Sequence, residues 1–280
     1  MPLEDDCADI LKKARTGQAL ALADMARLTG VPEVEIAALE RGDRPSDRAA
    51  VFALSSALGL RPGTLEHIVW DGWVPRPSAP IAGVGTIHGD IGGYAVKGYV
   101  VYDSGEALLV DTAYNASAMM TFLESRRLRL VGICLTHGHA DHAEGLQPLL
   151  KRWNVRVYLG PNDLALLPWR PPNESLIAPG DGRTIAVGGL TVRCMTTPGH
   201  TPGGICYVTE AQKRSVCFVG DTLFAGSIGR SNPHTLYATH LDSVRRRVLK
   251  LPLDFTLLPG HGPATTVREE VDQNPFSAIP

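Results

Sequence analysis

The sequence lacks several features that would narrow its class at once. No apolar run reaches the roughly 18 uncharged residues that a membrane-spanning helix needs. The first ten residues are acidic, unlike the basic start of a secretory signal peptide. The formal net charge of −2 gives no general attraction to nucleic acid or to an anionic membrane. We therefore expect a cytoplasmic protein that does not associate with membranes.

Paired cysteines are also missing. The five cysteines are odd in number, and no two of them form a CxxC pair. Cys134, Cys206 and Cys217 lie in apolar runs that are typical of strands. We expect buried, reduced thiols, with neither disulfide bonds nor a zinc finger.

The chain is long enough for two domains, because it has 280 residues and 44% hydrophobic residues. Three prolines within residues 74–80 (VPRPSAP) predict an extended linker. Residues 1–73 have the pattern of a small all-helical domain. Residues 81–280 alternate short apolar runs with helical segments, which predicts a layered α/β domain. The helical segments expected there are 115–127, 143–153, 162–167 and 235–250.

Residues 135–145, LTHGHADHAEG, hold three histidines and one aspartate within six positions. Further candidate ligands follow a glycine at the end of an apolar run, where the backbone can turn sharply into a shared cleft. The candidate metal ligands are His137, His139, Asp141, His142, His200, Asp221 and His261. Seven nitrogen and oxygen ligands exceed one tetrahedral zinc ion and predict two divalent metal ions. The spacing of His67, His234 and His240 is not that of ligands, so we expect them at the surface or as caps.

The motifs THGHADH, TPGHTPG, GDTLF and PGHGP, in this order, resemble those of the metallo-β-lactamase fold. The stretches GDTLFAGSIGR and LPGHGPATTVREEVDQNPF are similar to the glyoxalase II-like branch of that fold. The resemblance covers about residues 81–280. It implies an αβ/βα sandwich of two mixed sheets, with the active site at one edge.

The resemblance also implies roles for individual residues. His137, His139 and His200 would hold one ion, and Asp141, His142 and His261 the second. Asp221 would bridge the two ions. Asp111, in LLVDT, matches an aspartate that supports the metal loop without binding the metal. Zinc is the expected metal, with iron or manganese as the alternatives.

A metal-bound hydroxide at such a centre would attack the carbonyl of a small-molecule thioester or ester, with Asp141 taking or orienting the proton. Glyoxalase II carries a C-terminal helical domain that binds glutathione, whereas this chain ends at Pro280, so glutathione specificity stays open. A persulfide dioxygenase with one iron on the equivalents of His137, His200 and Asp221 is the enzymatic alternative.

Residues 22–46 resemble the helix-turn-helix of phage-repressor-type (XRE-type) regulators, and the resemblance covers about residues 8–70. The family would read DNA with the second helix, here about 32–41. That helix carries Glu33 and Glu35 where repressors place polar or basic residues. Residues 1–73 hold eight Lys or Arg against twelve Asp or Glu, a net charge of −4 that would repel phosphates.

We therefore expect no DNA-binding residues in the helical domain. We expect it to support a homodimer or to wall the active site, with Trp70 and Trp73 docking it onto the enzyme domain. A metabolite-sensing DNA-binding regulator is the alternative from a different functional class.

Overall fold

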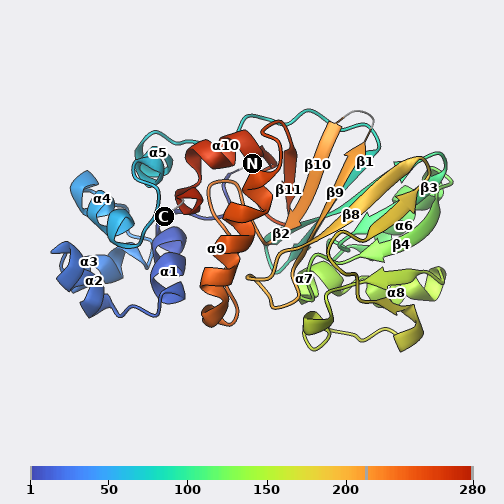
Figure 1. Ribbon diagram of the computed structural model, residues 1–280, viewed down its shortest axis with the longest axis horizontal. Helices are drawn as coiled ribbons and strands as arrows, with labels where there is room; N and C mark the ends of the chain where they lie inside the picture. The colour runs from blue at the N-terminus through green and yellow to red at the C-terminus, as the bar shows by residue number, and fades with distance from the viewer. Residues whose placement is uncertain (1, 212–213, 279–280) are drawn as a thin grey trace.

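The computed structural model describes residues 2–211 and 214–278, and its main body is a sandwich of two six-stranded sheets (Figure 1). Sheet A has the order β1-β2-β3-β4-β5-β6, with strands Val84–Ile91, Tyr94–Asp103, Glu106–Val110, Arg129–Cys134, Arg156–Tyr158 and Leu176–Ile177. Sheet B has the order β12-β11-β10-β9-β8-β7; β7 to β12 are Thr184–Val187, Leu190–Thr196, Ile205–Ala211, Arg214–Gly220, Thr256–Pro259 and Thr265–Thr266. Both sheets mix parallel and antiparallel pairs, which confirms the predicted αβ/βα sandwich.

The central strands are buried on both faces, by the other sheet on one side and by helices on the other. Alternate side chains of such a strand enter opposite faces of the sheet. In β10, Val216 and Phe218 enter the core between the sheets, while Cys217 and Val219 enter the core under the outer helices. The ring of Phe218 packs against that of Tyr99 from sheet A, with centroids 5.2 Å apart. The five cysteines are free and buried, as expected.

Helices cover both outer faces of the sandwich. Helices α6 (Ala116–Ser125) and α8 (Leu146–Arg152) pack on sheet A, and α9 (Tyr237–Arg246) and α10 (Val267–Gln273) pack on sheet B. The helix expected over 162–167 is wrong: the chain forms only a 3-10 turn, Pro161–Asp163, because Asp163 turns inward as a buried hydrogen-bond acceptor. In the part of the chain that the structure describes, no helix is long and apolar enough to cross a membrane.

Five short helices precede the sandwich and lie beside α9 and α10 (Figure 1). They are α1 (Cys7–Gly17), α2 (Leu22–Thr29), α3 (Glu33–Leu39), α4 (Arg48–Ala57) and α5 (Thr64–Trp70). Their buried side chains form one continuous cluster with those under α9 and α10. Gly17 lies against the ring of Tyr237, and Trp73 lies against Gly226. Residues 74–80 form neither helix nor strand.

The contact between Gly17 and Tyr237 gives a direct test of how tightly the helical region is held. A β-carbon at Gly17 would lie 2.4 Å from the buried Tyr237 ring, so we expect Gly17→Ala to cost about 1–3 kcal/mol of unfolding free energy. Thermal melting should show a drop of about 2–4 °C per kcal/mol. Gly180→Ala is the matched control, because nothing lies within 4 Å of the added carbon. Equal melting temperatures for the two variants would contradict the tight packing.

Candidate metal centre

The predicted ligands meet at one edge of the sandwich, although they come from four separate loops. The loop after β4 and the short helix α7 (Ala140–Ala143) carry the first group, and the loops after β8, β10 and β11 carry one residue each. Together they bring seven side chains to one place: His137, His139, Asp141, His142, His200, Asp221 and His261. Their nitrogen and oxygen atoms form three overlapping groups, each within 4.8 Å.

Glycines at two strand ends make this convergence possible. Gly220, just before Asp221, has a φ of +49°, and a β-carbon there would lie 2.3 Å from the Thr136 hydroxyl oxygen. A β-carbon on Gly260, just before His261, would lie 2.5 Å from Oδ1 of Asp221. The glycines before Asp221 and His261 therefore reflect crowding as well as backbone freedom.

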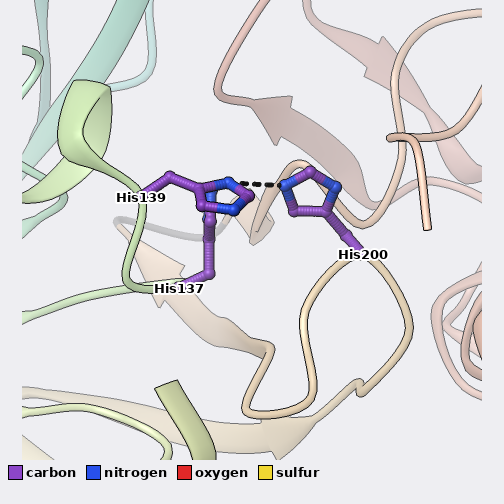
Figure 2. A group of neighbouring side chains, drawn as sticks. All are labelled: His137, His139 and His200. Carbon is purple, nitrogen blue, oxygen red and sulfur yellow. Dashed lines mark hydrogen bonds between the residues drawn. The ribbon is translucent and has the colours of Figure 1, made fainter. Parts of the chain in front are cut away.

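Three imidazole rings form the first group of ligands (Figure 2). Nε2 of His200 lies 3.1 Å from Nδ1 of His139, and the His137 ring centroid lies 4.7 Å from both of theirs. His137 and His139 reach in from one loop, and His200 faces them from another. Nitrogen atoms at this separation can share one tetrahedral ion, whose bonds to nitrogen are about 2.0–2.1 Å long.

The second group consists of Asp141, His142 and His261, and it is more acidic than the first because it contains a carboxylate. Oδ2 of Asp141 lies 3.2 Å from Nε2 of His261 and 3.5 Å from Nε2 of His142. Asp221 lies between the two groups, because its Oδ2 is 3.6 Å from Nε2 of both His200 and His261. Its other oxygen is 3.4 Å from Nε2 of His142. The geometry therefore offers two adjacent cation positions with Asp221 next to both.

Each of four histidines is oriented by an acceptor for its Nδ1–H. His142 donates to Asp111 at 2.9 Å, His200 to the carbonyl of Arg230 at 2.7 Å, and His261 to the carbonyl of Ala95 at 2.7 Å. In the same way, the Thr136 hydroxyl lies 3.0 Å from Nδ1 of His137. This pattern leaves the Nε2 lone pairs directed into the centre, as metal-binding histidines require.

Asp111 is the hub of these contacts. It is almost fully buried and accepts hydrogen bonds from the backbone N–H and the hydroxyl of Thr136, both at 2.7 Å, besides that from His142. Its φ of +57° is unusual for a residue other than glycine, and such strain persists only where the surroundings hold it. The sequence places Asp111 at a strand end, and the structure shows it bracing the metal loop.

The donor set fits a metal ion. Nε2 of His137, Nε2 of His142 and Oδ1 of Asp221 are buried and have no hydrogen-bond partner among residues 2–211 and 214–278. A buried polar atom without a partner costs about 1–3 kcal/mol, so three of them at one point favour a shared ligand. Imidazole and carboxylate are the donors that zinc, manganese and iron accept.

The electrostatics of the two groups differ. Burial disfavours protonation of His261, but the nearby carboxylates of Asp221 and Asp141 outweigh it and raise the pKa of this imidazole to about 9. Burial lowers the pKa of His200 to about 4, although Asp221 partly opposes it. The acidic group thus favours a positive charge, while burial lowers the pKa of both His137 and His200 and keeps these two rings neutral and electron-donating.

The sequence did not point to two buried residues that support the centre. Asp163 accepts from the N–H of Gly138 and Gly203 and from the Thr201 hydroxyl, so it ties together two ligand loops. His240, expected at the surface or as a cap, is fully buried, and its Nε2 lies 2.8 Å from the carbonyl oxygen of Thr222. Neither position has a sequence pattern that marks it, because both contacts join segments far apart in the chain.

Comparison with known proteins now places this architecture. A sequence model of the Metallo-beta-lactamase superfamily matches residues 91–270. The chain belongs to this superfamily. It is a metal-dependent hydrolase of the superfamily, with His and Asp clusters suited to metal binding. The five N-terminal helices lie outside the matched residues.

Individual members of the metallo-beta-lactamase superfamily resemble the chain to similar degrees. Hydroxyacylglutathione hydrolase GloC of Haemophilus influenzae is 32% identical over 190 residues, covering 62% of this chain and 88% of GloC. The crystal structure of the BLEG-1 B3 metallo-beta-lactamase has a TM-score of 0.59 at 30% identity, covering 70% of this chain and 100% of that one. TTHA1623, solved in a di-iron-bound form, has a TM-score of 0.58 at 27% identity, covering 68% and 99%.

Metal removal should destabilise the protein, because ions would cross-link ligands from four loops. A ligand that binds only the folded state adds about 4 kcal/mol when its free concentration is a thousand times its Kd. We expect the melting temperature to fall on chelation and to recover when zinc is added back. An unchanged melting curve in a verified metal-free sample would count against metal binding at this centre.

Asp111→Asn should weaken metal binding about 10–100-fold, because the amide cannot accept all the hydrogen bonds that orient His142 and Thr136. A competitive zinc titration against a chromophoric chelator measures the change. Asp181→Asn is the matched control: Asp181 also accepts from the N–H and hydroxyl of one threonine, Thr196, but lies outside the centre. If both variants bind zinc equally well, Asp111 has no role in orienting the ligands.

Proposed function

We propose that the protein hydrolyses a small-molecule thioester or ester at a two-metal centre. The observation that carries this proposal is the position of Asp221, which lies within 3.6 Å of ligand nitrogens from both groups. A carboxylate so placed suits a bridge between two ions. The similarity to a protein named hydroxyacylglutathione hydrolase, and to one solved in a di-iron-bound form, supports the same reading.

In this proposal His137, His139 and His200 would hold one ion, Asp141, His142 and His261 would hold the other, and Asp221 lies where it could serve both. When bound there, divalent ions would lower the pKa of a bound water to about 7 and polarise a substrate carbonyl. Zinc is the metal we propose, because neutral imidazoles with carboxylates are its common ligands in hydrolases.

The protein's own side chains then orient and move protons. Asp141 is half-buried, and contact with His261 and His142 outweighs burial and lowers the pKa of its carboxyl group. It is therefore ionised at neutral pH and can accept or orient a proton at its carboxylate oxygens. Asp111 and Thr136 keep the rings fixed while charge changes at the centre. Thioesters suit this site because a thiolate leaves without a strong general acid.

For the helical region we propose a repressor-like helix-turn-helix that does not bind DNA. Helices α2 and α3 are joined by a turn in which Gly30 has a φ of +75°. The exposed start of α3 presents Glu33 and Val34, whose side chains offer phosphates neither a positive charge nor a hydrogen-bond donor. Glu40, just after α3, is ion-paired with Arg15 of α1. These features favour a role within the enzyme.

The first test combines metal analysis with turnover. We expect about two zinc, iron or manganese ions per chain in protein purified without added metal, and hydrolysis of S-lactoylglutathione or simpler thioesters. Asp141→Asn should lower kcat at least about 100-fold, because it removes both a ligand of the second ion and a proton-transfer group. Asp242→Asn, at an exposed aspartate of α9, serves as the control. One iron per chain, no hydrolysis, and oxygen uptake with glutathione persulfide would contradict the proposal in favour of a dioxygenase.

A further inference from the structure

The metal centre opens into a pocket of about 820 Å³ that has two walls of different origin. His139 and His200 are among the residues that line it. One wall is the loop Arg230–His234, which belongs to the sandwich. The other wall is the last part of α1, from Lys13 onward, with the loop to Ala21. Part of the helical region therefore lines the same pocket as two of the candidate ligands.

The wall formed by α1 is held by specific contacts. Arg15 donates to both carboxylate oxygens of Glu40, at 2.5 and 2.6 Å, and to the carbonyl of Leu20 at 2.7 Å. The side chains of Arg15 and Glu40 are only 14% and 7% exposed, so water screens this pair weakly. Lys13 donates to the carbonyl of Ile228 at 2.9 Å and forms an ion pair with Asp5. These bonds fix the wall both to α3 and to the sandwich loop.

Small side chains leave this wall open to a substrate. Thr16, Ala19 and Ala21 line the pocket, and the Thr16 hydroxyl already donates to the carbonyl of Lys12 at 2.7 Å. Two of the basic residues in the pocket lining, Lys13 and Arg15, are already ion-paired with Asp5 and Glu40, so their charges are compensated within the protein. Pockets of about 300–1,000 Å³ hold drug-sized ligands, so a small acyl group alone would leave most of this one unfilled.

We infer that α1 and the loop to Ala21 form the substrate-selecting wall of the active site, and that they admit thioesters or esters with a bulky group beyond the scissile carbonyl. The reaction in this inference is that of the proposed function, on which the inference rests. The selection among substrates is argued from the geometry of the pocket. Thr16, Ala19 and Ala21 are positioned as specificity determinants, because larger side chains there would take the volume that the bulky group needs.

Thr16→Trp tests the wall by filling it without removing an ion pair. We expect kcat/KM for an S-acylglutathione to fall about tenfold or more, mainly through KM, and kcat/KM for the acetyl thioester of N-acetylcysteamine to stay within about twofold. Thr121→Trp is the matched control: Thr121 is exposed on α6 and makes the same bond, to the carbonyl four residues earlier. Equal losses for both substrates, or no loss for either, would overturn the inference.

A second measurement does not depend on turnover. Thr16→Cys and Thr121→Cys can each be spin-labelled selectively, because the five native cysteines are buried. Manganese(II) bound at the metal centre should broaden the label spectrum at position 16 and leave that at 121 unchanged. Equal spectra would show that α1 does not wall the centre. Clear broadening with no thioester or ester turnover by the unmodified protein would instead overturn the proposed function and the substrate class, and keep α1 as the wall.

Discussion

Convergent lone pairs at the edge of the sandwich are the constraint on which the rest of the structure depends. Nε2 of His137, Nε2 of His142 and Oδ1 of Asp221 are buried together without a hydrogen-bond partner among the described residues. Placing them so is costly unless a cation neutralises and coordinates them. The strained backbone of Asp111, the crowded glycines at the strand ends and the inward turn of Asp163 all serve to hold these atoms in place.

The helical region and the sandwich form one physical unit. The cluster that contains Ile10, Leu54 and Leu65 continues into Val219 and Val244 of the sandwich. Burying apolar area of this extent is the main favourable contribution to folding, so the cost of separating the two parts is spread over many side chains. Contacts at Gly17 and Gly226 add close steric fit to this apolar contact. A region that is docked in this way places α1 at a fixed distance from the metal centre.

Much of the fold and the centre could be predicted from local sequence patterns. A strand followed by Gly and then His or Asp predicts His200, Asp221 and His261, and the close spacing of histidines and an aspartate within residues 137–142 predicts the other four ligands of the metal centre. The supporting contacts of Asp163 and His240 could not be predicted, because their partners, Gly203 and Thr222, are distant in sequence. The expected helix at 162–167 failed for the same reason: a tertiary hydrogen bond overrode a helical composition.

The ion pair between Arg15 and Glu40 restricts the amino-acid substitutions that this protein can accept in evolution. Glu40 follows α3, the helix that a repressor would present to DNA, yet its carboxylate accepts hydrogen bonds from Arg15, which lines the pocket. A region that began as a separate module would therefore have lost its independence. Replacing Glu40 alone leaves a buried guanidinium uncompensated, and replacing Arg15 alone leaves a buried carboxylate. The two positions must then vary together in any lineage that keeps this arrangement, and the helical region cannot be exchanged for a homologue without also altering the pocket beside His139 and His200.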